Sequence, residues 1–520
     1  MEFNKTLNSK RNIIWGWFNR IVKIITPFLF RTVLIKKLGI EYLGINSLFN
    51  SILGILSLAE LGFDAAVVSI MYKYVAEDKK DEISILLNFL KKTYFCVGSI
   101  IIIVGGILIP FLPHLIKDIN SVPNDINIYF VYIIFLLNSA VSYFFGGYKN
   151  SIFNSYQRVD IISNIYTFIL LTSFLTQVFI IIVFKNYSLY IITMPVFTII
   201  NNLIIVIMAN KYYPELKPKG KLGENDRQEL IKKIKGVFFT KIGSVLSYSF
   251  DNIIISSFLG ITLLAKYTNY FYLISAVQGF LTVINVSIQP IIGNLIYTKS
   301  VEENYSYLTR LTFIYNWIVS FCCCCFIMLV QPFVVIWLGK DYQLPTSIVY
   351  SLTFSFYFST FDSILGIYKA AKGIWWEDRY RCFIAGIVNL VLNYSIAVIL
   401  QNKSPYYVLL GVSISTFVSS AFIGTPWATF VTFKIYFKTG LKNYTIRIFQ
   451  FFLVSIMVCS IVISIWSLFS PLLSNMNKIF TFIIQLVYVT LFFNLFMYLC
   501  YFKTNVFKNS KQFLAERIAR

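Results

Sequence analysis

The sequence predicts an all-α protein that crosses a membrane many times. Of its 520 residues, 57% are hydrophobic and only 13% are charged, and the mean hydropathy is +0.71. Soluble domains hold about 25% charged residues, so this composition excludes an ordinary soluble domain. Two further observations support the same class: apolar runs recur along the chain at the length of a membrane span, and basic residues lie between them with a strong bias.

The apolar runs number about fourteen when they are matched to the roughly 20 residues that a spanning helix needs. The second, eighth and twelfth runs are longer than one span requires, which favours a tilt or a kink in each. The predicted helices cover approximately residues 12–36, 45–72, 93–112, 127–148, 162–184, 188–210, 237–259, 268–298, 311–338, 346–370, 381–400, 405–433, 446–469 and 478–502.

The distribution of basic residues sets the expected orientation. The formal net charge is +22. If the N-terminus is cytoplasmic, most Lys and Arg fall in the inner loops and tails, as the positive-inside rule describes. We therefore expect both termini in the cytoplasm. Because these residues are spread over many separate inner segments, we expect no nucleic-acid partner. The first apolar run has no small-residue cleavage site, so no cleavable signal peptide is predicted.

The longest polar interruption follows the sixth predicted helix and contains two prolines and two glycines. Transporter folds are often built from repeats with a binding site at the repeat interface. The interruption predicts an N-terminal lobe, a basic cytoplasmic linker, a C-terminal lobe, and a last pair of helices with a cytoplasmic tail. The corresponding ranges are 1–210, 211–236, 237–436 and 437–520.

A weak internal repeat supports this organisation. A Leu-Gly-Ile triplet centred on Gly39 ends the first predicted helix, and a second one centred on Gly260 ends the seventh. Aligning the two glycines places Lys241 opposite Arg20. Six helices per repeat would give both repeats the same orientation in the membrane.

The first predicted helix contains three basic residues, Arg20, Lys23 and Arg31. At about 100° per residue, Lys23 lies about 60° to one side of Arg20 and Arg31 about 20° to the other, with Pro27 near the same line. A charge at the centre of a span costs about 2.5–3.5 kcal/mol even on lenient scales, so such residues rarely face lipid. An inward-facing cationic stripe is suited to bind an anion. Arg31 has a simpler alternative, because it lies close enough to the helix end to snorkel.

Two acidic residues, Glu60 and Asp64, lie four positions apart in the second predicted helix and therefore about 40° apart on one face. Two acids in an apolar helix cannot both stay ionised without partners. One interpretation is a structural ion pair with Lys23 or Arg20. The other is a proton or cation site coupled to transport. The two interpretations are compatible, because an ion pair that breaks on substrate binding is also a switch.

Two more acids, Asp251 and Asp362, lie in the seventh and tenth predicted helices and are further candidates for ion coupling or gating. Lys369 shares a face with Asp362, seven residues on, and snorkelling at the cytoplasmic boundary is its simplest explanation. Lys241 joins the cationic stripe as a candidate binding residue through the internal repeat.

The sequence contains no phosphate-binding glycine loop, no paired-acid motif in an outer loop and no metal-ligand spacing. The predicted external loops are short, whereas a membrane glycosyltransferase needs a larger site outside the membrane. We therefore predict no catalytic residues, no metal site and no enzyme activity.

The first two predicted helices resemble a known family. The residues RTVLI at 31–35, LGIEYLGINSLF at 38–49 and LAELGF at 58–63 are similar to the start of Wzx-type polysaccharide repeat-unit flippases. These belong to the multidrug/oligosaccharidyl-lipid/polysaccharide exporter (MOP) superfamily. Beyond the second helix, the resemblance rests on the helix count and the loop pattern.

The resemblance implies a MATE-like fold of two six-helix lobes around a central cavity, plus two C-terminal helices. It also implies alternating access, a bacterial plasma membrane location and an undecaprenyl-pyrophosphate-linked oligosaccharide as substrate. A polysaccharide polymerase and glycosyltransferases are the expected partners besides membrane lipids. No cofactor is expected beyond a coupling ion, H⁺ or Na⁺. A cation-coupled multidrug exporter of the same superfamily stays open as the alternative, although its cationic substrates would need an acidic cavity.

Overall fold

The computed structural model confirms an all-α membrane architecture. It describes residues 5–57, 63–117, 122–374, 376–473 and 475–518, except for the side chains of 5–17, of 513–518 and of several positions elsewhere, most of them in 225–248. Every element in these ranges is helical. Nine helices of the described chain are long and apolar enough to cross a membrane, or ten if one bent pair forms a single span. Each of the fourteen predicted runs overlaps a helix, but a count of fourteen spans is not confirmed.

The chain divides into two compact units, unit 1 up to Ala265 and unit 2 from Lys266. The boundary falls within the first turns of α10 (Ile261–Thr298). This division reflects contacts alone, so the lobes predicted at 1–210 and 237–436 stay a prediction. Unit 1 contains α1 (Lys5–Lys37), α2 (Ile40–Leu56), α3 (Phe63–Ala76), α4 (Lys80–Leu108), η2 (Ile109–Leu115), α5 (Ile128–Phe144), η4 (Gly147–Lys149), α6 (Asn150–Ser155), α7 (Val159–Val183), α8 (Tyr187–Tyr212) and α9 (Glu224–Leu259).

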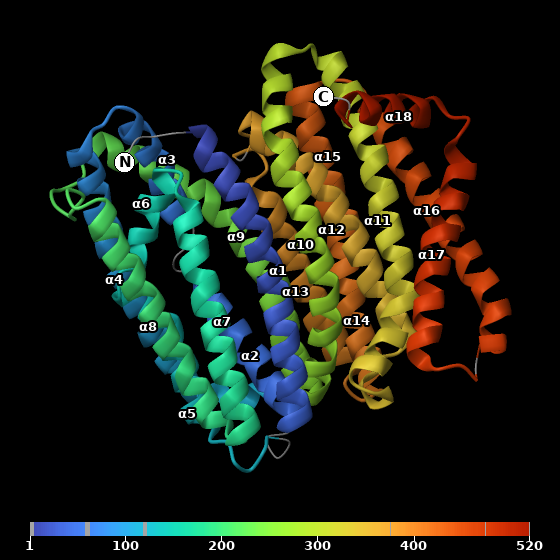
Figure 1. Cartoon of the computed structure of the whole chain (residues 1–520), viewed down its shortest axis with the longest axis horizontal. Helices are drawn as coiled ribbons and strands as arrows, with labels where there is room; N and C mark the ends of the chain where they lie inside the picture. Colours follow the sequence, from blue (N-terminus) through green and yellow to red (C-terminus); the bar gives the residue numbers. More distant parts are fainter. Residues whose placement is uncertain (1–4, 58–62, 118–121, 375, 474, 519–520) are drawn as a thin grey trace. The chain divides into compact units, whose positions relative to one another are not determined.

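The helices of unit 1 run side by side as a bundle (Figure 1). α1 packs along α7, α5 packs against both α4 and α8, and α2 packs against α9. α2 also lies close to the first residue of α10, because a Cβ atom built on Gly44 of α2 would lie 2.2 Å from the backbone oxygen of Ile261. Asn252 of α9 also donates a hydrogen bond of 2.9 Å to Ser51 of α2.

Both glycines of the internal repeat stand at junctions between consecutive helices. Gly39 joins α1 to α2 with φ 135° and ψ 167°, and Gly260 joins α9 to α10 with φ 90° and ψ 170°. This region of backbone space is almost restricted to glycine. The structural match at these two positions supports the repeat that the triplets indicate.

The second predicted helix, 45–72, covers α2, which ends at Leu56, and α3, which begins at Phe63. Asp64 lies in the first turn of α3. Glu60 and its neighbours 58–62 lie outside the described residues, so the shared helical face of Glu60 and Asp64 stays a prediction. An acid in the first turn of a helix is favoured by the helix dipole.

The segment predicted as a basic linker is attached to unit 1. Lys80 pairs with Glu215 at 2.6 Å, and Lys219 pairs with Asp81 at 2.6 Å. The side chain of Asn88 also donates a hydrogen bond of 2.7 Å to the backbone oxygen of Gly220. These contacts join the first turns of α4 to the chain between α8 and α9.

Unit 2 is organised around α11, against which α12, α16, α17 and the short terminal helix α18 all pack. α18 crosses the end of the bundle instead of continuing α17 (Figure 1). The twelfth predicted run contains a π-helical stretch, η6, and a second one, η7, begins at the last residue of the run. The elements are the rest of α10, α11 (Val301–Trp337), η5 (Lys340–Tyr342), α12 (Thr346–Lys372), α13 (Arg379–Leu400), α14 (Pro405–Val418), η6 (Ser419–Gly424), α15 (Thr425–Thr432), η7 (Phe433–Phe437), α16 (Leu441–Phe469), η8 (Ser470–Leu473), α17 (Lys478–Tyr501) and α18 (Asn505–Ile518).

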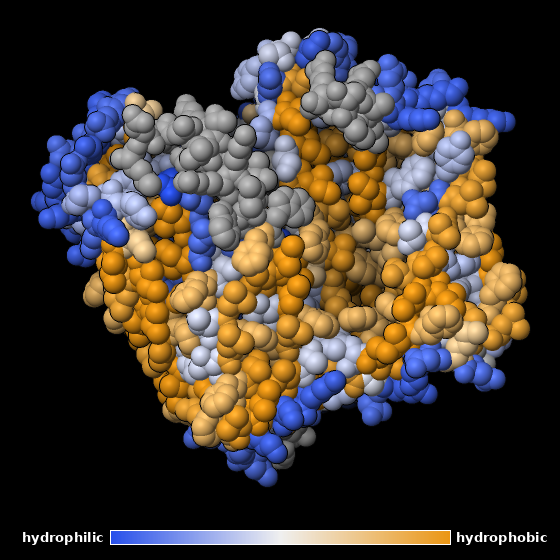
Figure 2. Space-filling view, in the orientation of Figure 1, coloured by the Kyte–Doolittle hydropathy of each residue, from blue (hydrophilic) through white to orange (hydrophobic). Residues whose placement is uncertain are grey.

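The surface of each unit agrees with a membrane location. The sides of the helices are largely hydrophobic, and hydrophilic residues gather at the helix ends (Figure 2). Exposed side chains of the spans include Leu175 and Ile399, at 64% and 74% exposure. Water would not favour such surfaces, whereas bilayer hydrocarbon does.

Candidate functional site

The three basic residues of the first helix lie on one continuous element, α1, which also contains Pro27. Arg20 and Arg31 are half-buried and Lys23 is exposed within unit 1. The neighbouring face of α1 is buried, with Asn19 and Thr26 each 4% exposed. The cationic stripe therefore runs beside the packed face of α1 and not within it.

Contacts with α7 position the inner part of this stripe. The Lys23 ammonium lies 4.4 Å from the centre of the Tyr166 ring, within cation–π range. One position after Tyr166, the Thr167 hydroxyl donates a hydrogen bond to the side-chain oxygen of Asn19, which lies four residues before Lys23 on α1. Among the described residues, Arg20 and Lys23 form no ion pair, and the buried Arg20 Nε has no hydrogen-bond partner. These two cations are therefore available to bind an anion.

Arg31 lies further along α1, near a group of tyrosines from α8. Its charge acts on Tyr190, whose hydroxyl accepts a hydrogen bond of 3.4 Å from Asn46 of α2. Tyr187 donates a shorter bond, 2.7 Å, to the same Asn46. Arg31 is thus held among aromatic and amide groups, about 16 Å along the helix from Arg20.

Two of the acids predicted in unit 1 lie on two further helices, α3 and α9. Asp64 is half-buried in the first turn of α3, and Asp251 is 4% exposed on α9, next to the Asn252 that bonds to α2. The side chain of Lys241 lies outside the described residues, as does Glu60. The proposed pairing of Glu60 or Asp64 with Arg20 or Lys23 therefore stays a prediction.

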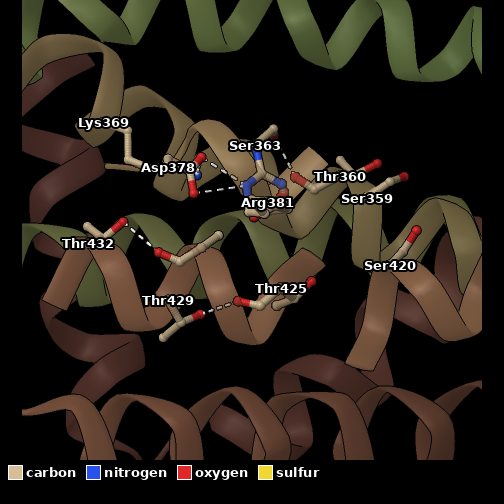
Figure 3. Close-up of polar contacts among 12 residues, drawn as sticks. Ser359, Thr360, Ser363, Lys369, Asp378, Arg381, Ser420, Thr425, Thr429 and Thr432 are labelled. Atoms are coloured by element: carbon tan, nitrogen blue, oxygen red, sulfur yellow. Dashed lines mark hydrogen bonds and ion pairs between the residues drawn. The ribbon is translucent and has the colours of Figure 1, made fainter. Parts of the chain in front are cut away.

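In unit 2, Asp362 belongs to a largely buried group of four charges that spans the turn between α12 and α13. Figure 3 shows three of them, Lys369, Asp378 and Arg381. Arg381 of α13 donates hydrogen bonds both to Asp362 and to Asp378, the latter with Nε at 2.9 Å from Oδ2. The Lys369 ammonium donates to the same Asp378 oxygen at 2.7 Å. Two acids and two bases make the group neutral. We call these four residues the charge cluster.

The charge cluster corrects one expectation and adds two residues that the sequence analysis missed. Lys369 does not snorkel to the surface: it is 2% exposed and turns inward to Asp378. Neither Asp378 nor Arg381 was predicted as a site residue. Asp378 directly precedes α13, and its spacing from Arg381 is that of a helical ion pair. This spacing is the feature of the sequence from which the Asp378–Arg381 pair could have been predicted.

The two groups differ in what they can do chemically. The α1 stripe offers cations that can form charge-assisted hydrogen bonds to an anion. The charge cluster is already satisfied apart from one buried oxygen of Asp362, Oδ1, that has no partner. In the part of the chain that the structure describes, no cluster of three or more His, Cys, Asp and Glu could hold a metal ion.

Comparison with solved structures identifies the fold. The chain is similar to the lipid II flippase MurJ in an inward closed conformation, at 17% identity and a TM-score of 0.64, covering 96% of this chain and 99% of that one. It is also similar to an inward-facing multidrug resistance MATE transporter of the MOP superfamily, at 13% identity and a TM-score of 0.62, covering 80% and 95%. A third similar structure is a MOP superfamily transporter from Pyrococcus furiosus, at 15% identity and a TM-score of 0.54, covering 84% and 96%. At these identities, the likeness shows a MOP-type transporter fold.

The sequence comparisons agree with the resemblance in the first two helices. No curated protein matches the chain. Residues 9–296 match the family described as "Polysaccharide biosynthesis protein", a range that includes the whole cationic stripe and more than half of the chain. The chain is thus a member of the polysaccharide biosynthesis protein family, with the fold of a multi-pass MOP transporter.

Proposed function

We propose that this protein is a flippase for undecaprenyl-pyrophosphate-linked oligosaccharide repeat units. It moves them from the inner to the outer leaflet of a bacterial plasma membrane by alternating access, for assembly of a surface polysaccharide. Its termini are cytoplasmic, and it works beside a polymerase and glycosyltransferases that make and use the repeat units. Family membership and the MOP fold support this proposal.

The observation that carries the proposal is the cationic stripe of α1. Arg20 and Lys23 lie in an apolar element and have no carboxylate partner among the described residues. Charges within an apolar membrane span are rare unless they are paired or functional, and a pyrophosphate supplies the missing negative charge. Arg20 and Lys23 bind the pyrophosphate, with Arg31 and Lys241 as helpers, while the prenyl chain stays in lipid.

The acidic residues have a separate role in this proposal. Glu60, Asp64 and Asp251 couple the cycle to H⁺ or Na⁺, because acidic residues in apolar helices of transporters are typical of ion pathways. Asp362, which Arg381 neutralises, acts in gating. The membrane potential is worth about 2.3 kcal/mol per charge per 100 mV, so one coupled cation is enough to bias the cycle.

Depletion of the protein in its own host tests the proposal directly. We expect lipid-linked oligosaccharide to accumulate on the cytoplasmic leaflet, measured by extraction and by accessibility to an added glycosidase, while surface polymer disappears. An intact surface polymer without accumulation would contradict a flippase. If resistance to cationic drugs fell in the same cells, the multidrug exporter alternative would replace it; the likeness to MATE transporters is the observation that favours that alternative.

A further inference from the structure

Unit 2 contains a lateral groove that the proposed transport of repeat units does not use. α12 and α16 both pack on α11, and the groove lies among these three helices. Its volume is about 280 Å³. Two lining residues on the flanking helices, Tyr350 and Ile456, are each 37% exposed. The groove therefore opens at the surface of unit 2, between apolar side chains of α12 and α16.

The groove runs along α16 and has a group of aromatic rings at one end. Its lining positions on α16 run from Phe452 to Ser464, about 18 Å at 1.5 Å per residue. At the Phe452 end, the rings of Tyr357 and Phe354 from α12 lie 5.2 and 6.3 Å from the Phe452 ring, centre to centre. Half of the hydrocarbon core of a bilayer is about 15 Å thick. The groove thus matches the length of a chain in one leaflet.

The floor of the groove carries small polar residues, but their polar atoms are already bonded within the protein. Ser320 donates to Ser455 at 2.7 Å, and Ser455 donates to the backbone of its own helix at 2.7 Å. The hydroxyl of Tyr357 donates to Asn316 at 2.7 Å, and that of Thr353 donates to its own helix at 2.8 Å. A guest in the groove would find no unsatisfied buried hydroxyl among these residues, which favours an apolar guest over a sugar or an ion.

We propose that this groove is a binding site for one acyl chain of a bilayer phospholipid. Small floor residues give it depth, the bonded hydroxyls make it effectively apolar, and the aromatic end stops the chain near mid-membrane. An empty groove of this size would leave its walls without packing partners, and in hydrocarbon only a lipid chain can fill it. The chain fills the space between α12 and α16 and supports their packing on α11.

A photoreactive phospholipid tests the site. The full-length protein is reconstituted in bilayers that contain phosphatidylglycerol with a diazirine on one acyl chain, irradiated, and mapped by peptide mass spectrometry. We expect label on the α12 and α16 peptides that line the groove. Ser460→Phe and Ser464→Phe, which place a ring at the exposed rim, should each reduce that label at least tenfold. Both positions are on the exposed side of α16, so neither change disturbs the core.

The matched control is Ile461→Phe. Ile461 follows Ser460 directly, lies about 100° round the helix and is 36% exposed, but does not line the groove. This variant should keep the label. Equal labelling of Ser460→Phe and Ile461→Phe would overturn the proposal. So would preferential labelling of the groove by a diazirine-bearing C55 prenyl phosphate over the phospholipid, because the occupant would then be a prenyl chain.

Discussion

Two groups of charged residues in apolar helices, the charge cluster of unit 2 and the α1 stripe of unit 1, differ in how their charges are compensated. In unit 2, Asp362, Lys369, Asp378 and Arg381 compensate each other completely and are nearly removed from the surface. In unit 1, the α1 stripe carries positive charge only, and Lys23 contacts a tyrosine ring where a carboxylate would be expected. The difference separates charge used to hold helices together from charge kept available for a ligand.

Energetic arguments support this distinction. A buried ion pair gains little net stability over an apolar substitute, but removal of one partner is costly because the other charge stays buried. A cation without a partner bears a cost at all times, and selection retains it where a ligand compensates. We therefore expect changes in the stripe to affect transport and changes in the charge cluster to affect folding.

The largest expected effect is on transport, in the double variant Arg20→Ala with Lys23→Ala. Each charge-assisted hydrogen bond is worth about 1.5–3 kcal/mol, so losing two should reduce flipping by at least about a hundredfold. Surface polysaccharide should disappear, by immunoblot or staining, while the amount of folded protein in the membrane stays normal.

The matched control for this variant is Lys36→Ala with Lys37→Ala. It removes the same charge from the same helix, at exposed positions in its last turn. Export should persist. Wild-type export in the Arg20 and Lys23 double variant would rule out the stripe as the pyrophosphate site.

The second prediction concerns stability. Asp378 accepts hydrogen bonds from both Lys369 and Arg381, so Asp378→Asn leaves buried cations without compensation and should cost about 3–5 kcal/mol. Thermal unfolding followed by size-exclusion chromatography should show a large decrease in the midpoint. Adding Lys369→Met should restore part of it, because one cation is removed. Asp341→Asn, at an exposed acid of the same unit, is the control. Equal unfolding midpoints for Asp378→Asn and Asp341→Asn would show that the charge cluster does not stabilise the fold.

Much of the architecture could be predicted from the sequence because bilayer hydrocarbon constrains it so strongly. Each of the fourteen apolar runs overlaps a helix, and the alignment of Gly39 with Gly260 locates two junctions of the same backbone form. Helical periodicity also placed the α1 cations on one stripe. These features depend on local sequence and on the length of a membrane span.

Features that depend on tertiary contacts could not be predicted. Nothing in the periodicity shows that Lys369 turns inward. Lys369 near a helix end is equally compatible with snorkelling until its partner, Asp378, is placed by the turn into α13. Tyr166 contacts Lys23 only because α1 packs along α7. Pairing between helices is set by packing, which one sequence does not specify.

A smaller effect on the rate of flipping tests how Lys23 is positioned within the stripe. Tyr166→Leu removes the ring beside Lys23, and a cation–π contact of this kind is worth about 0.5–1 kcal/mol. Flipping should fall about two- to fivefold in reconstituted vesicles. Tyr166→Phe keeps the ring face and should stay close to wild type. If the Leu and Phe variants had equal rates, the ring would have no part in positioning Lys23.

The smallest expected effect comes from the exposed ion pairs that join Lys80 to Glu215 and Lys219 to Asp81. Hydrogen bonding to the lysines lowers the pKa of Glu215 from its ordinary value of 4.5 and the pKa of Asp81 from 3.8. Acids with a lowered pKa in the folded state contribute stability above their ordinary pKa and lose it as pH falls through the lowered value.

Because water and salt screen exposed pairs, Glu215→Gln with Asp81→Asn should shift the unfolding midpoint at pH 7 by no more than about 2 °C. The shift should vanish in acid, below the lowered pKa values, and shrink in high salt. A shift as large as that of Asp378→Asn would show that burial does not separate the two kinds of ion pair, and the contrast between the charge cluster and the exposed pairs would fail.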